Sequence, residues 1–140
     1  MLADDRLFDP DPTQKALAME LYARIRDLPI VSPHGHVEPA LFSDPERRFG
    51  DPVELLIRPD HYVLRMLYSQ GIPYGRLLSK AHPRQTWQLF AENFYLFRGT
   101  PSGIWLTHDL EALFGVTEKL TGASASRIYE QIEAALLTPE

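Results

Sequence analysis

Residues 29–39 read PIVSPHGHVEP, and the fold prediction starts from this segment. Ile30 and Val31 are apolar and β-branched, and they run directly into the polar triplet His34-Gly35-His36. A β-branched run bounded by proline is typical of a short strand. We therefore predict one short, buried strand whose far end carries the two histidines.

Helical patterns flank this segment on both sides. Upstream, Asp11 and Pro12 are typical of a helix N-terminus. The apolar residues that follow recur at spacings of four, four and three and form one stripe: Leu17, Leu21, Ile25 and Leu28. Downstream, caps and apolar periodicity predict short helices that begin near residues 51, 60, 83, 100 and 126. The predicted fold class is mainly α with one short N-terminal strand.

The two histidines form a candidate metal site. Residues i and i+2 of a strand point to the same side, so His34 and His36 would project together from the strand end. Neutral imidazole is a good ligand for Zn and related divalent ions, and the chain has no cysteine that could offer a thiolate. A turn in which two histidines happen to fall is the alternative, because H-x-H is a short pattern.

Asp60-His61-Tyr62 is the second candidate site. His61 and Tyr62 fall in the first turn of a predicted helix, where a Tyr hydroxyl can pass a proton and a His can bind a carboxylate or hydroxyl. Arg65, one turn further on, could clamp a carboxylate through its planar guanidinium. From the residues alone, the simpler interpretation is a capping Asp60, a packed Tyr62 and a solvated Arg65.

Composition limits the class of function. The formal net charge is -5 and the basic residues are scattered, which argues against a nucleic-acid partner. No apolar run approaches the roughly 20 residues that span a bilayer, and the N-terminal segment lacks the pattern of a secretory signal. We therefore expect a cytoplasmic protein with neither a nucleic-acid nor a membrane partner.

Three segments resemble, in order, motifs of the uronate (glucuronate) isomerases of the amidohydrolase superfamily. They are PIVSPHGHVEP at 29–39, which resembles the first barrel strand and its H-x-H, DHYVLRMLYSQG at 60–71, and FYLFRGTPSGIWLTHDLEALFGV at 94–116. The opening RLFDPDPTQKALAMELYARIRDLPI, residues 6–30, also matches in style. The resemblance therefore spans nearly the whole chain.

The resemblance implies the N-terminal part of a (β/α)8 TIM barrel with a large helical insertion after the first strand. Residues 1–40 would hold the first helix and the barrel strand with H-x-H, and residues 41–140 would form the helical insertion subdomain of a single unit. A full barrel needs about 200 residues at minimum. We therefore expect the isolated chain to be incomplete and to have little or no activity.

The implied reaction is aldose-ketose isomerisation in hexuronate catabolism, from D-glucuronate to D-fructuronate and from D-galacturonate to D-tagaturonate. His34 and His36 match the family's metal-binding pair, for which Zn is expected and Mn is the alternative. Tyr62 matches the tyrosine implicated in proton transfer, and His61 and Arg65 match substrate-side positions. The implied partner is a hexuronate substrate, and a homo-oligomer is left open.

Two other functions compete with this hypothesis. A metal-dependent hydrolase of the same superfamily would use His34 and His36 to activate water, and substrate preference would distinguish it from an isomerase. A non-catalytic helical interaction module would bind a partner through exposed apolar surface. Self-association without tight metal binding would identify that module.

Overall fold

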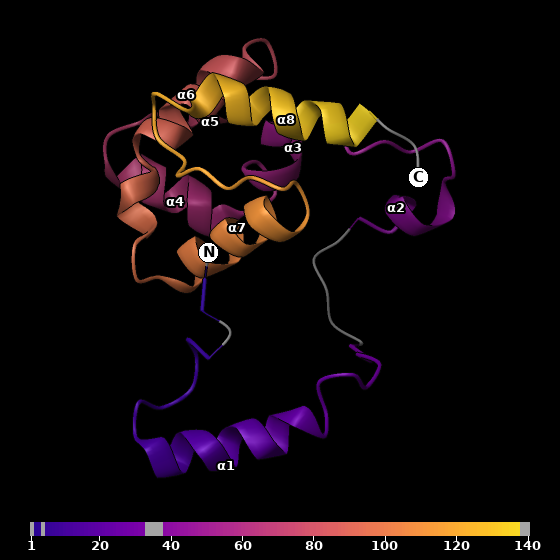
Figure 1. Cartoon of the computed structure of the whole chain (residues 1–140). Helices are drawn as coiled ribbons and strands as arrows, with labels where there is room; N and C mark the ends of the chain where they lie inside the picture. The colour runs from indigo at the N-terminus through magenta and orange to yellow at the C-terminus, as the bar shows by residue number, and fades with distance from the viewer. Residues whose placement is uncertain (1, 4, 33–37, 138–140) are drawn as a thin grey trace. The chain divides into compact units, whose positions relative to one another are not determined.

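The computed structural model describes residues 2–3, 5–32 and 38–137. The chain divides into two units, Met1–Pro45 and Glu46–Glu140. The first unit contains α1 (Pro12–Ala23) and α2 (Ala40–Ser43). The second unit is built from the remaining helices in Figure 1, which are α3 (Pro52–Leu56), α4 (His61–Ser69), α5 (Tyr74–Leu77), α6 (Pro83–Glu92), the 3-10 helix η1 (Phe94–Phe97), α7 (Pro101–Ala112) and α8 (Ala125–Leu137). Within the described ranges, no helix is long and apolar enough to cross a membrane.

The helix starts follow the capping pattern of the sequence. At four N-termini the side chain of the preceding residue accepts backbone hydrogen bonds from the first turn, namely Asp11 before α1, Asp51 before α3, Asp60 before α4 and Thr100 before α7. Such a cap satisfies N–H groups that have no partner within the helix. A proline at the first helical position reinforces three of these caps, in α1, α3 and α7.

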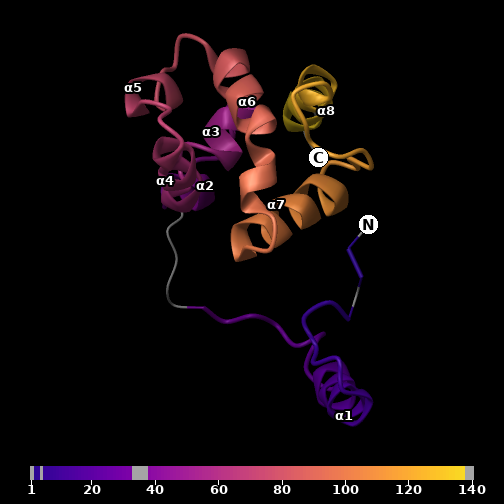
Figure 2. The same ribbon diagram turned by 90° about the vertical axis from the view of Figure 1, so that its left-hand side faces the viewer.

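The apolar core of the second unit lies where α3, α6 and α8 pack against one another. Figure 2 shows α6 standing between α3 on one side and α8 on the other. Trp87 of α6 stacks edge-on against Tyr129 of α8, with 6.0 Å between ring centroids. Its indole Nε1 donates to the carbonyl oxygen of Ala125 at 2.8 Å, which satisfies the one polar atom that Trp87 brings into the core.

The predicted N-terminal strand is wrong. No strand occurs in the ranges 2–3, 5–32 and 38–137, and Ile30 and Val31 are 93% and 89% exposed rather than buried. A strand is held by hydrogen bonds to a neighbouring strand, and the described part of this chain supplies no such neighbour. The β-branched sequence therefore has the propensity for a strand but lacks the partner that would form one.

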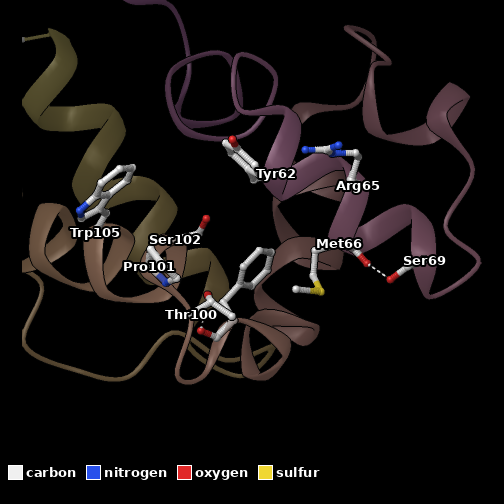
Figure 3. Close-up of a pocket in the computed structure, with 9 residues that line it drawn as sticks. Tyr62, Arg65, Met66, Ser69, Thr100, Pro101, Ser102 and Trp105 are labelled. Carbon is white, nitrogen blue, oxygen red and sulfur yellow. Dashed lines mark hydrogen bonds between the residues drawn. The ribbon is translucent and has the colours of Figure 1, made fainter.

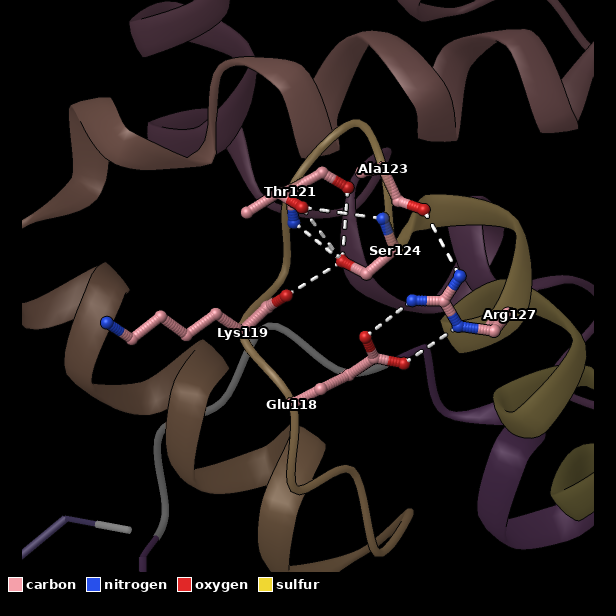
Figure 4. Close-up of polar contacts among 6 residues, drawn as sticks. All are labelled: Glu118, Lys119, Thr121, Ala123, Ser124 and Arg127. Carbon is pink, nitrogen blue, oxygen red and sulfur yellow. Dashed lines mark hydrogen bonds and ion pairs between the residues drawn. The ribbon is translucent and has the colours of Figure 1, made fainter.

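The loop before α8 is fixed by a buried serine (Figure 4). Ser124 Oγ accepts from the backbone N–H of Thr121 at 2.9 Å and lies 2.7 Å from the carbonyl oxygen of Lys119, to which it donates. Beside it, the guanidinium of Arg127 donates to both carboxylate oxygens of Glu118, at 3.2 and 2.8 Å. That pair lowers the pKa of Glu118, but both side chains are exposed, so the buried serine contributes more to stability.

Replacing Ser124 with alanine is expected to lower the free energy of unfolding by about 1–3 kcal/mol, because the N–H of Thr121 and the carbonyl of Lys119 lose a buried partner. Urea denaturation followed by circular dichroism measures this. Ser126→Ala is the matched control, since Ser126 is exposed and its hydroxyl makes one long contact of 3.5 Å with Glu130. That control should stay within about 0.5 kcal/mol of the parent; equal losses in the two variants would contradict the assignment.

Candidate functional site

A cleft of about 650 Å³ opens on the second unit between α4 and α7. One wall comes from α4 and the other from the start of α7, as Figure 3 shows. The lining residues are Tyr62, Arg65, Met66, Ser69, Phe97, Thr100, Pro101, Ser102 and Trp105. Apolar and aromatic side chains with a few polar groups among them are typical of a small-molecule site.

The α4 wall is held in place by its buried face. Val63, Leu64 and Leu67 are buried in the core of the second unit. Tyr62 and Arg65 lie three positions apart, so they share another face of the helix, the face that borders the cleft. The Asp60 cap fixes where this helix begins, because its carboxylate accepts from the N–H of Tyr62 at 2.8 Å. The chain therefore presents Tyr62 and Arg65 together.

The α7 wall is held by close backbone packing. Thr100 Oγ1 accepts from the N–H of Gly103 at 3.1 Å and lies 2.7 Å from the carbonyl oxygen of Phe97, to which it donates. Gly103 packs so closely that a Cβ there would clash with this same carbonyl. This arrangement requires glycine, and it fixes the start of α7. Ser102 in the first turn and Trp105 directly after it line the cleft.

Arg65 supplies the charge of the cleft. No other described residue that lines the cleft carries a charged side chain. The guanidinium carbon of Arg65 lies 5.1 Å from the centre of the Tyr62 ring. Within the described ranges no carboxylate forms an ion pair with Arg65. A guanidinium that stacks on a tyrosine beside a cleft is suited to binding a ligand carboxylate.

The structure brings together two of the predicted site residues. Tyr62 and Arg65 both line the cleft, whereas His61 does not line it. The His61 ring instead packs on the Tyr62 ring, with 4.3 Å between centroids. The predicted metal pair, His34 and His36, lies outside the described residues. In the remainder, no group of three or more His, Asp or Glu side chains is placed to hold a metal ion.

Sequence reasoning missed Ser102 and Trp105. The apolar stripe of α7 runs through Leu106 and Leu110, which are buried, and Trp105 lies off that stripe and is exposed. A large aromatic residue outside a core-facing stripe is a signal for a binding surface. The position of Trp105 could therefore have indicated a binding surface on this helix. It could not have identified the cleft, because the facing helix α4 is distant in sequence.

Asp109, one turn beyond Trp105 on α7, carries an electrostatic cost. Burial raises the pKa of its carboxyl, and the nearby His108 opposes part of that rise. The folded state therefore holds the proton more tightly than the unfolded chain, and stability falls as pH rises above the unfolded pKa. We expect Asp109→Asn to raise the Tm at pH 7 and to leave it unchanged near about pH 3, where both states are protonated. Thermal melts at the two pH values test this; an equal gain at both would contradict it.

Comparison with known proteins gives one consistent result. The sequence profile of the glucuronate isomerase family matches residues 12–140. A uronate isomerase from Nostoc punctiforme is 50% identical over 147 aligned residues, which cover 100% of this chain and 31% of that protein. The crystal structure of glucuronate isomerase from Caulobacter crescentus superposes with a TM-score of 0.92 at 46% identity, over 99% of this chain and 30% of that chain. The uronate isomerase structure from Thermotoga maritima gives a TM-score of 0.83 at 25% identity, over 97% and 29%.

These matches agree with the three motifs of the sequence. The chain belongs to the glucuronate isomerase family. It spans about 30% of the length of the relatives it matches, at 31% of the Nostoc protein and 30% of the Caulobacter structure.

Proposed function

We propose that this chain forms part of a uronate isomerase that converts D-glucuronate to D-fructuronate and D-galacturonate to D-tagaturonate. The observation that carries the proposal is the cleft that Tyr62 and Arg65 line together. Family membership supports an isomerase over a hydrolase. A hexuronate has a carboxylate at one end and its reacting carbons, C1 and C2, at the other. Its binding site therefore needs a cation for the carboxylate and a proton-transfer group beside the reacting carbons.

The reaction moves hydrogen within the substrate. In the open-chain aldose, C2 loses a hydrogen and C1 gains one. At the same time the O2 hydroxyl loses its proton and O1 gains one, so the formula is unchanged. A phenol can both donate and accept a proton. Tyr62, which lines the cleft, is the group that would carry the proton between the two carbons.

Arg65 and His61 would bind the substrate. The Arg65 guanidinium can form two parallel hydrogen bonds with the uronate carboxylate. His61, whose ring packs on the Tyr62 ring outside the lining of the cleft, would hydrogen-bond a sugar hydroxyl. A divalent ion, Zn or Mn, would polarise the substrate oxygen, with His34 and His36 as two of its ligands.

The test uses a chimera in which this chain replaces the matched segment of the C. crescentus glucuronate isomerase. Removing the carboxylate clamp with Arg65→Met is expected to raise KM for D-glucuronate by about 10–100-fold, the effect of losing one charge-assisted interaction. Arg65→Lys should recover part of this, because it keeps the charge without the fork. Initial-rate kinetics on the purified chimera measure the change.

Arg76→Met is the matched control. Arg76 is also an exposed arginine on a short helix of the second unit, but it does not line the cleft. The KM of the Arg76→Met chimera for D-glucuronate should equal that of the parent chimera. If Arg65→Met and Arg76→Met have the same KM, the cleft does not bind the carboxylate and the proposal fails.

A further inference from the structure

Trp105 is a large aromatic side chain that the fold of the second unit leaves uncovered. It is 67% exposed, whereas the other tryptophan, Trp87, is 1% exposed and packs against two aromatic rings of the core. Within the described ranges no ring stacks on the Trp105 indole, and no group hydrogen-bonds its Nε1. Folding therefore does not explain a tryptophan at this position, because an indole contributes to stability when it is buried.

The cleft places this indole opposite a cation. Trp105 belongs to the α7 wall and Arg65 to the α4 wall (Figure 3). Most of the side chains that line the cleft are apolar or aromatic, Met66 and Phe97 among them. The cleft therefore offers a ligand one positive charge, an apolar lining and an aromatic ring that no described residue covers.

The serine and threonine hydroxyls of the cleft differ in whether they have partners. Ser69 and Thr100 each donate to a backbone carbonyl oxygen at 2.7 Å. The Ser102 hydroxyl has no partner in the part of the chain that the structure describes. Ser102 lies three positions before Trp105, so the two share a face of α7. In the view of Figure 3 the Ser102 oxygen lies between Trp105 and Tyr62. This hydroxyl is therefore available to a ligand.

These features fit the chemistry of a sugar acid. A hexuronate has a carboxylate, C–H groups along its carbon skeleton and hydroxyls at its edges. The C–H groups carry small positive charges and the face of an aromatic ring is negative, so the skeleton can stack on an indole. We propose that Trp105 is the stacking platform for the hexuronate whose carboxylate Arg65 binds, and that Ser102 hydrogen-bonds one of its hydroxyls. Trp105 then binds and orients the substrate and takes no part in proton transfer. The identity of the ligand rests on the proposed function.

The two tryptophans of the chain allow a binding test that needs no turnover. Acrylamide quenches the emission of an exposed tryptophan much more than that of a buried one, so Trp105 gives the quenched signal and Trp87 the reference. The 140-residue chain is titrated with D-glucuronate at constant acrylamide. We expect a saturable loss of quenching. Trp105→Phe should show no such loss, because its emission comes from Trp87 alone.

Two further ligands each carry half of the recognised chemistry. D-glucose has the hydroxyls without the carboxylate, and acetate has the carboxylate without the sugar. Each should need at least about a tenfold higher concentration than D-glucuronate for half of the effect, because each lacks one set of contacts. A titration without saturable protection by D-glucuronate, or with equal protection by acetate, would overturn the proposal.

Ser102→Ala tests the hydroxyl contact in the same titration. The concentration of D-glucuronate that gives half of the effect should rise about two- to tenfold, the effect of losing one neutral hydrogen bond. An unchanged concentration would overturn the part of the proposal that concerns Ser102.

In the chimera the same role predicts a change in KM rather than in kcat. Trp105→Ala should raise KM for D-glucuronate at least about tenfold and change kcat by less than about threefold. Trp105→Phe should keep KM within about threefold of the parent, because a phenyl ring retains an aromatic face. Trp105→Leu, which is apolar but has no ring, should behave like Trp105→Ala.

Tyr95→Ala is the matched control for these kinetics. Tyr95 is also an exposed aromatic residue of the second unit, at 58%, and it does not line the cleft. Its alanine variant should keep the parental KM. Equal KM values in Trp105→Ala and Tyr95→Ala would overturn the proposal.

The two experiments separate this proposal from the proposed function. If D-glucuronate protects Trp105 in the chain but a folded chimera does not isomerise it, the proposed function fails and the Trp105 platform stands. If the chimera isomerises D-glucuronate and Trp105→Ala keeps the parental KM, the platform alone fails. Unchanged protection in Arg65→Met would contradict the carboxylate clamp of the proposed function and leave the platform in place.

Discussion

Tyr62→Phe is expected to lower kcat of the chimera for D-glucuronate by about 10²–10⁴-fold, the usual contribution of a positioned proton-transfer group. The substitution removes the phenol hydroxyl and keeps the ring, which still lines the cleft and still packs against His61 and Arg65. KM should therefore change by less than about threefold, because the lost interaction belongs to the transition state. Steady-state rates of ketose formation separate the two parameters.

Tyr68→Phe is the matched control for this experiment. Tyr68 is on the same helix and is exposed to a similar degree, 54% against 58% for Tyr62. Its ring stacks on Tyr74 at 4.6 Å, and it does not line the cleft. We expect kcat of this variant to equal that of the parent. A Tyr62→Phe variant with parental kcat, or equal losses in both variants, would exclude Tyr62 as the proton carrier.

Trp87→Ala is expected to destabilise the chain by about 3–5 kcal/mol, the range for removing a large aromatic side chain from a core. Trp87 is 1% exposed, and its ring contacts Phe90 as well as Tyr129. The variant also leaves the carbonyl oxygen of Ala125 without its indole donor. Because whole domains are stable by only about 5–15 kcal/mol, this loss removes a large fraction of the total. Urea denaturation at constant m-value measures it.

Trp105→Ala is the matched control, because the same atoms are removed from a side chain that is 67% exposed. Its free energy of unfolding should stay within about 0.5 kcal/mol of the parent. Comparing the two variants distinguishes a tryptophan in the core of the second unit from one in the wall of the cleft. A loss below about 1 kcal/mol for Trp87→Ala would contradict the packing of α6 against α8.

Helix starts were predictable because their chemistry is local. A cap at Asp51 or Asp60 involves backbone N–H groups two and three residues further on, so the sequence contains both partners. Helix ends were harder to predict. The apolar stripe of the first helix was expected to continue through Ile25 and Leu28, but α1 ends at Ala23. The chain continues as turns, with the N–H of Ile25 donating to the carbonyl of Tyr22.

The prediction of a strand at Ile30 and Val31 was wrong because β-branched residues show only the propensity for a strand, whereas a strand also needs a pairing partner that the local sequence does not contain. The site shows the same division between local and distant information. Tyr62 and Arg65 share a face of α4 by their spacing, which the sequence shows. Trp105 lines the same cleft because the second unit places α7 opposite α4. The periodicity of the α7 sequence does not predict that placement.

Turnover of D-glucuronate, compared between the chimera and the 140-residue chain, shows whether this segment serves uronate isomerisation and whether it needs the rest of the enzyme. Both proteins are incubated with D-glucuronate and with Zn or Mn, and D-fructuronate is quantified. We predict sustained isomerisation by the chimera and little or none by the chain alone. An inactive but folded chimera would contradict the claim that this segment serves uronate isomerisation, and turnover by the isolated chain would contradict the claim that it needs the rest of the enzyme.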